Sequence, residues 1–326
     1  MAKSVAWYCL RLILLGVLAC SPAHAQSEFT GQRFPYQAFD RLPATPVTIG
    51  GAILDIAFAP GEFALPRSAF VAWIERSAKA VSVYYGRFPV ASVRLLIVPA
   101  SGSGVQKGTS FGYRGAAIRL IIGSDTTEAE LRKDWVVVHE MTHLALPDLP
   151  DPHLWLAEGV ATYVEPIARV EAGDLTAEKI WGDMVRDMPK GLPETGDRGL
   201  DHTPTWGRTY WGGAMFCLLA DVELRKHTGN NSGLQQALRG IVDAGGNMEQ
   251  VWPVERIFSI ADQATGTAVL TDLYEKTRTQ PYAPDLDALW RDLGIVVRGG
   301  RVTFDDSAPL ASIRQAITAK HTTAPH

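Results

Sequence analysis

Two histidines and a glutamate stand at a spacing that suits metal-dependent chemistry. The chain of 326 residues contains the segment His139-Glu140-Met141-Thr142-His143. On a helix, side chains four residues apart lie on the same face, so His139 and His143 can present ring nitrogens to one metal ion. Glu140 can reach a water molecule on that metal without being a ligand itself. This HExxH pattern predicts a zinc-binding helix with Glu140 as a general base.

A single helix is predicted to carry this segment. Thr127 and Glu130 read as a capping box at its start. Apolar residues then recur at helical spacing around the histidines, namely Leu131, Trp135, Val138, Leu144 and Ala145. Pro147 and Pro150 end the element, because proline cannot continue a helix.

A second helix is predicted to begin near Asp151-Pro152 and to run through Glu165. The connection between the two helices is short, which favours antiparallel packing and brings Glu158 back beside the histidines. Glu165 lies two helical turns after Glu158. It either hydrogen-bonds a ligand histidine or is an ordinary solvated glutamate.

The segment Trp-Leu-Ala-Glu-Gly-Val-Ala-Thr-Tyr at 155–163 resembles the second zinc-binding helix of gluzincin peptidases. In that family the glutamate is the third protein ligand. The resemblance implies that Glu158 completes a site for one Zn²⁺ with His139 and His143. Three protein ligands leave a fourth position open for water, which is typical of a catalytic rather than a structural zinc.

A second resemblance begins at Tyr210. Residues 210–226 are similar to the tyrosine-led helix of glycyl aminopeptidase-like gluzincins, and residues 273–295 are similar to the end of that catalytic domain. The resemblance implies that the Tyr210 hydroxyl donates a hydrogen bond to the oxyanion of the reaction; packing in the core is the alternative role for this tyrosine. In relatives an edge strand aligns the substrate, and residues 110–122 are the candidate here. The glycine-rich acidic strand of the exopeptidases and the PDZ domain of many relatives find no counterpart.

These features predict a zinc-dependent metallopeptidase that hydrolyses peptide or protein substrates, as an endopeptidase or an aminopeptidase. One alternative is a non-catalytic protein on a peptidase scaffold that binds peptides or cell-envelope components. The intact base Glu140 argues against it. Another alternative is a zinc-stabilised structural domain, but a closed structural site normally has four protein ligands.

Residues 1–25 are predicted to be a signal peptide. Lys3 and Arg11 precede an apolar core at residues 12–19, and Ala23-His24-Ala25 precedes Gln26. The protein is therefore expected to be exported, either periplasmic or secreted. Lipoprotein processing at Cys20 is a minor alternative. No other apolar run is long enough to cross a bilayer, so the mature chain is expected to lack a transmembrane segment.

The composition of the mature chain narrows its chemistry further. Removing the leader leaves Cys217 as the last of the three cysteines, so an intrachain disulfide and a cysteine zinc cluster are both excluded. Its apolar neighbours predict that this thiol is buried. The net charge changes from −4 to −6, because Lys3 and Arg11 leave without an acid. A mildly acidic chain without basic runs argues against nucleic acid or an anionic membrane as a partner.

The expected fold is α+β, a thermolysin-like zincin with a small N-terminal sheet lobe and a mainly helical C-terminal lobe. The first lobe spans residues 26–123, the catalytic helical lobe residues 124–295, and a partly disordered C-terminal extension residues 296–326. The first lobe is predicted to contain strands at 47–58 and 93–98, a helix at 66–85 and a strand or hairpin at 110–122; a further hairpin is predicted at Gly299-Gly300. Trp181, Trp206, Trp211, Trp252 and Trp290 are predicted to pack in the core, and His153 and His202 to lie at the surface.

Overall fold

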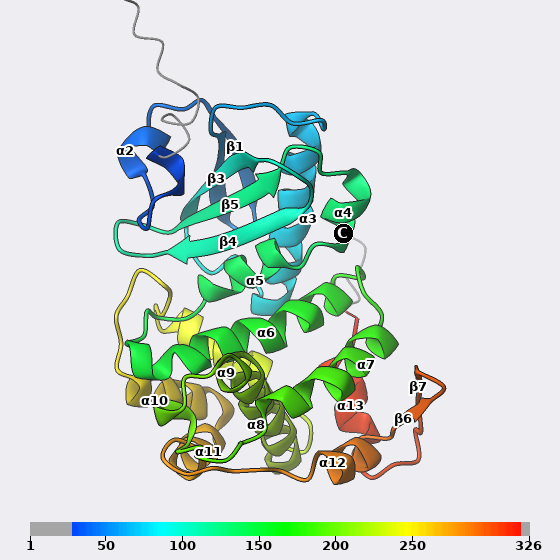
Figure 1. Ribbon diagram of the computed structural model, residues 1–326. Coiled ribbons are helices and arrows are strands. Elements are labelled where there is room, and N and C mark those ends of the chain that lie inside the picture. Colours follow the sequence, from blue (N-terminus) through cyan, green and yellow to red (C-terminus); the bar gives the residue numbers. More distant parts are fainter. Residues whose placement is uncertain (1–27, 321–326) are drawn as a thin grey trace, which may run out of the picture.

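A computed structural model of this chain describes residues 28–320. A sheet with its helices forms the upper lobe in Figure 1, and a stack of helices forms the lower one. The predicted signal peptide, with Cys20 and the cleavage site, lies outside the described residues. Within residues 28–320, every helix is too short or too polar to traverse a bilayer.

The upper lobe is built on a five-stranded sheet with the strand order β1-β2-β3-β5-β4. The strands are β1 (Ala44–Ile49), β2 (Ala52–Phe58), β3 (Ser92–Ala100), β4 (Val105–Phe111) and β5 (Ala117–Gly123). Gly50 and Gly51 turn the β1–β2 hairpin with positive φ angles of 57° and 84°, which glycine adopts without strain. The pairs β2–β3 and β3–β5 are parallel, whereas β4 runs antiparallel to β5. Strand β4 is therefore an edge of the sheet.

Helices cover both faces of this sheet. Helix α3 (Arg67–Tyr85) begins after Pro66, ends at Gly86 and buries its apolar side in the main core with the inner side chains of β2 and β3. The short helix α2 (Tyr36–Phe39) and the preceding Phe34 pack with Leu96 and Phe111 in a second cluster on the other face. Alternating burial along the strands thus gives each face its own apolar layer. The predicted helix at 66–85 and strand at 93–98 are present as α3 and β3, whereas the segment 47–58 is divided at its two glycines into the β1–β2 hairpin.

The lower lobe is mainly helical. Its α-helices are α4 (Glu128–Lys133), α5 (Val136–His143), α6 (Leu154–Glu171), α7 (Ala177–Asp187), α8 (Gly213–His227), α9 (Leu234–Asp243), α10 (Val254–Thr265), α11 (Val269–Thr277), α12 (Leu286–Asp292) and α13 (Ala311–Ile317). Short helical turns are η1 (Asp151–His153), η2 (Met188–Gly191), η3 (Leu200–His202) and the π-helical η4 (Arg208–Gly212). Strands β6 (Ile295–Arg298) and β7 (Arg301–Phe304) form the predicted hairpin around two glycines.

The segment predicted as a C-terminal extension packs against this lobe as far as the structure describes it. Ile313 and Ile317 on α13 are buried in the main core. Arg314 is buried as well, and its Nη1 donates to the carbonyl of Leu293 at 2.8 Å. Residues 296–320 therefore form part of the helical lobe, and the end of the predicted extension, residues 321–326, lies outside the described residues.

The single helix predicted around the histidines is instead two. The capping box of Thr127 and Glu130 is present at the start of α4. At Asp134 the backbone becomes extended, with φ −61° and ψ 142°, and the Asp134 carboxylate accepts a hydrogen bond from the amide of Val137 at 3.2 Å. A side chain that caps the next helix competes with continuation of the first. Trp135, predicted to pack in the stripe, is consequently 53% exposed.

Other predictions about single side chains have mixed outcomes. Trp181, Trp252 and Trp290 are buried, as predicted, and so is the Cys217 thiol. Trp206 is 61% exposed, so its assignment to the core was wrong. His153, predicted at the surface, is partly buried, with its Nε2 3.2 Å from the Tyr274 hydroxyl. Trp206 and His153 both lie where distant segments meet, and the spacing of residues along the sequence does not predict such contacts.

Candidate metal centre

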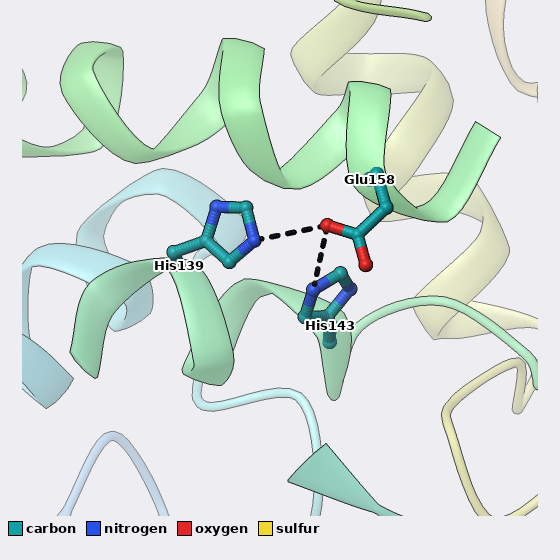
Figure 2. Close-up of side chains that lie close together, drawn as sticks. All are labelled: His139, His143 and Glu158. Atoms are coloured by element: carbon teal, nitrogen blue, oxygen red, sulfur yellow. Dashed lines mark hydrogen bonds and ion pairs between the residues drawn. The ribbon is translucent and has the colours of Figure 1, made fainter. Parts of the chain in front are cut away.

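Helices α5 and α6 bring His139, His143 and Glu158 together. The two imidazoles project from α5 towards the Glu158 carboxylate on α6 (Figure 2). His139 Nε2 lies 3.2 Å and His143 Nε2 3.6 Å from Glu158 Oε2. The three potential ligand atoms lie within 4.8 Å of one another. The predicted ligand residues therefore converge on one point between the two helices.

The geometry of this trio fits a zinc ion. Metal–ligand distances of about 2.0–2.2 Å in a tetrahedral arrangement separate neighbouring ligand atoms by about 3.3 Å. The distances of 3.2 and 3.6 Å from Glu158 Oε2 to the two ring nitrogens agree with that spacing. Two imidazoles and one carboxylate are also a donor set that zinc favours. The trio can thus hold Zn²⁺ with one position left free.

Electrostatics keep Glu158 in the form that binds a cation. Burial raises the pKa of its carboxyl group, but hydrogen bonds with His139 and His143 outweigh burial and bring the pKa to about 2. Burial acts to lower the pKa of His143. The carboxylates of Glu158 and Glu140 act more strongly in the opposite direction, so the pKa of His143 is raised. The Glu158 carboxylate thus contacts both imidazoles, which suits a cation between them.

Glu140 projects into a cavity beside the trio. The cavity has a volume of about 560 Å³ and is lined by residues 105–110 of β4, by α5, and by Glu158 and Tyr210. The Glu140 side chain is buried, and its Oε2 accepts a hydrogen bond from the Ser110 hydroxyl at 2.7 Å. A carboxylate held beside the metal position is the arrangement that a general base needs.

The edge strand predicted at residues 110–122 is displaced along the sequence. In the predicted segment Ser110 and Phe111 are the end of β4, residues 112–116 turn the chain, and the remainder is β5, an interior strand of the sheet. The edge facing α5 is β4 (Figure 1), and residues 105–110 line the cavity. The cause is the turn at residues 112–116, which folds the predicted strand back on an earlier one. The strand β4 carries Lys107 and no acidic residue.

Tyr210 lies at the same cavity. It belongs to the π-helical turn η4, and its ring stacks on the His139 imidazole with centroids 6.5 Å apart and an interplanar angle of 21°. Burial, followed by the charges of Glu158 and Glu140, raises the pKa of the Tyr210 hydroxyl to about 12. The hydroxyl therefore keeps its proton at neutral pH and can act as a hydrogen-bond donor.

Glycine contacts set the position of Tyr210 relative to Glu158. A Cβ on Gly159 would lie 2.3 Å from the backbone carbon of Gly213, and one on Gly213 would lie 2.1 Å from the carbonyl oxygen of Trp155. Helices α6 and α8 thus cross with their backbones in contact. On the other side, a Cβ on Gly191 would lie 2.3 Å from the backbone carbon of Trp211. The turn η4 is consequently held between α6 and η2, with little freedom to shift.

Glu165 does not reach a ligand histidine. Its Oε1 accepts a hydrogen bond from Arg169 Nη1 at 2.7 Å, and among residues 28–320 no hydrogen bond joins it to His139 or His143. Burial raises the pKa of its carboxyl group to about 7, although Arg169 opposes the change. Two helical turns place Glu165 about 10 Å further along α6 than Glu158, which is too far for the predicted contact. Neither the ligand contact nor the solvated alternative describes this buried residue.

A second cavity of about 560 Å³ adjoins the first, and Trp135, His139 and Tyr210 line both. Its other walls come from the middle of α6, from α7 and η2, and from the turn around η4, including Met184, Met188, Trp206 and Trp211. Lys190 Nζ lies 5.9 Å from the ring centroid of Trp206 and 5.7 Å from that of Trp211. The charged residues at its rim neutralise one another, since Arg186 pairs with Asp183 and Asp187. The cavity is therefore mainly apolar, a feature that sequence analysis missed because its walls come from distant segments.

Comparison with solved structures identifies the fold. An aminopeptidase N family protein from Idiomarina loihiensis superposes with a TM-score of 0.59 at 13% identity, over 79% of this chain and 50% of that one. An M1 zinc metallopeptidase from Deinococcus radiodurans gives a TM-score of 0.48 at 16% identity, over 74% and 52%. The chain spans about half the length of these proteins. No protein-family model and no curated protein matches the sequence. With its five-stranded sheet and many helices, the chain has a mixed α and β fold, which it shares with the aminopeptidase N family protein.

Proposed function

We propose that this chain is an exported zinc-dependent metallopeptidase of the gluzincin type. The observation that carries the proposal is the convergence of His139, His143 and Glu158 beside Glu140 in one cavity. The fold, shared with an aminopeptidase N family protein, supports it. Export rests on the leader-like composition of residues 1–25.

Glu140, Glu158 and the two histidines have different roles in the proposed hydrolysis. When bound, zinc supplies a Lewis acid that lowers the pKa of a water molecule to about 7 and polarises a carbonyl group. Glu140 takes the proton from the attacking water and delivers it to the leaving amine, which would otherwise depart very slowly. Glu158 and the two histidines would hold the ion and leave the carboxylate of Glu140 unligated, so that it stays available for this proton.

Tyr210 donates a hydrogen bond to the oxyanion that forms on the attacked carbonyl. Replacing Tyr210 with phenylalanine keeps the ring that stacks on His139 and removes only the hydroxyl. We expect kcat to fall by about 10²- to 10³-fold with little change in KM, because the lost bond is made mainly in the transition state. Steady-state kinetics of the variant give both constants. An unchanged kcat would assign Tyr210 to packing alone.

The substrate is a peptide that lies along β4. An edge strand offers free backbone groups that pair with an extended peptide. The charged residue of this strand is Lys107. The strand has no carboxylate that could hold a free amino terminus. A free amino terminus would have to be held by a carboxylate elsewhere in the cavity, which Asp134 and Asp148 also line, so both cleavage within a chain and removal of its first residue are compatible with this strand. The adjoining cavity with Trp206 and Met184 accepts a large apolar side chain next to the cleaved bond.

Metal analysis combined with peptide hydrolysis tests the proposal. The mature protein is expected to contain one zinc and to cleave a mixed peptide library, and chelation is expected to abolish the cleavage until zinc is restored. The variant His143→Ala loses one of three ligands and is expected to lose zinc and activity together. Replacement of His227, an exposed histidine at the end of α8, is the matched control and should change neither. Full zinc occupancy in His143→Ala would contradict the ligand assignment, and zinc without any cleavage would favour a peptide-binding role.

A further inference from the structure

The hydroxyl of Ser110 lies against Glu140 at two points. Ser110 Oγ is 2.7 Å from Glu140 Oε2 and 2.8 Å from the backbone carbonyl oxygen of the same residue. The first contact joins the edge strand β4 to the carboxylate at the centre of the cavity. The second joins the same strand to the backbone of α5. Ser110 thus connects the strand and the helix through its side chain.

The strand approaches Glu140 closely because it carries a glycine two residues earlier. A Cβ on Gly108 would lie 2.5 Å from Glu140 Cγ and 2.6 Å from Glu140 Oε1. The Glu140 side chain therefore fills the space above Gly108, with Oε2 against Ser110 and Oε1 against the glycine. Ser110 and Gly108 together restrict the Glu140 carboxylate to one position.

The strand itself is held firmly at this position. Ser110 pairs with Ile118 of β5, and Gly108 pairs with Leu120. Both partners are fully buried in the main core. Because β5 is an interior strand, the Ser110 hydroxyl is fixed by the sheet and not by a mobile loop.

We propose that Ser110 is a positioning residue that holds Glu140 in the orientation required for proton transfer, an inference that rests on the proposed function. With Oε2 bonded to the Ser110 hydroxyl and Oε1 set above Gly108, the carboxylate is held in one orientation, from which it receives the proton of the attacking water. The strand that aligns the substrate backbone thereby also aligns the base. Misplacing a reacting group by about 1 Å costs on the order of 10²-fold in rate.

The test compares three substitutions in the full mature protein. Ser110→Ala removes the hydroxyl, and Ser110→Thr retains it. Ser77→Ala removes a buried serine hydroxyl on α3, bonded to the Trp73 carbonyl at 2.9 Å, and controls for the loss of a buried hydrogen bond away from the cavity. If Ser110→Ala does not fold, Ser110→Cys keeps the volume and replaces the hydroxyl with a much weaker donor. The measurements are kcat, KM, zinc content and crystal structures of the metal-free proteins.

We expect Ser110→Ala to lower kcat by about 10- to 100-fold, with KM and zinc content unchanged and with the Glu140 carboxylate displaced or in two positions. Ser110→Thr should recover most of kcat, and Ser77→Ala should change thermal stability alone. A kcat within about twofold of the wild type, or a carboxylate that stays in place without the hydroxyl, would overturn the proposal. The crystallographic comparison needs no activity. An inactive wild-type protein would therefore refute the proposed function, while the position of Glu140 still decides the role of Ser110.

Discussion

The variant Glu140→Gln is expected to retain zinc and to lose hydrolysis by about 10²- to 10⁴-fold. Glutamine has the same shape as glutamate and can still accept the Ser110 hydrogen bond through its amide oxygen, so the cavity should keep its form. It cannot take a proton from water at neutral pH. The proposed metal ligands His139, His143 and Glu158 are untouched. Zinc content and kcat, measured on the same preparation, separate loss of the base from loss of the metal.

The control for this variant is Glu255→Gln, which neutralises an exposed glutamate in the first turn of α10. It should leave both zinc and kcat at the wild-type values. Turnover by Glu140→Gln at more than about a tenth of the wild-type rate would exclude Glu140 as the base, since general-base catalysis contributes at least about 10²-fold.

The variant Gly159→Ala is expected to destabilise the protein by about 3 kcal/mol or more. Alanine favours a helix over glycine by about 1 kcal/mol, so intrinsic propensity alone would predict the opposite sign. The added methyl group, however, would lie 2.3 Å from the backbone carbon of Gly213, and backbone atoms cannot move aside as the end of a side chain can. Helices α6 and α8 must separate. We expect the separation to move Tyr210 away from Glu158 and to lower kcat in the fraction that still folds.

Denaturant unfolding gives the free-energy change for this variant. The matched control is Gly182→Ala on α7, where the added Cβ would meet only the terminal methyl of Val302, at 3.3 Å. That substitution should be neutral or stabilising by up to about 1 kcal/mol, because the side-chain contact can relax and alanine favours the helix. If Gly159→Ala were as stable as the wild type, the close crossing of α6 and α8 would be wrong.

The parts of the site that depend on local spacing could be predicted from the sequence. The positions of His139 and His143 follow from the helical repeat, and the place of Glu158 follows from a short connection between two helices. Pro66 and the apolar spacing after it predicted α3. In each of these cases, residues that are close in sequence determine one another's position.

The remaining features depend on contacts between distant segments. The break at Asp134 requires a capping bond to the following helix, and the link between Ser110 and Glu140 spans a strand and a helix. The close crossing of α6 and α8 at Gly159 also depends on a distant segment. In the sequence it is marked only by a glycine that follows Glu158. The exposed position of Trp206 depends on how α6, α7 and η4 are arranged around the second cavity. Periodicity along the chain does not report such contacts.

Because η4 is a π-helical turn, the direction in which the Tyr210 side chain points depends on the number of residues in the turn. A π-turn holds one residue more than the α-helical turn it replaces, and it directly precedes α8. Shortening the chain by one residue between Tyr210 and α8 would restore α-helical winding and rotate the tyrosine by about 100° around the axis, with no change in α8 itself. The donor would then point away from His139 although every catalytic side chain was still encoded. An insertion or deletion at this turn would therefore remove the proposed Tyr210 hydrogen bond as completely as Tyr210→Phe does.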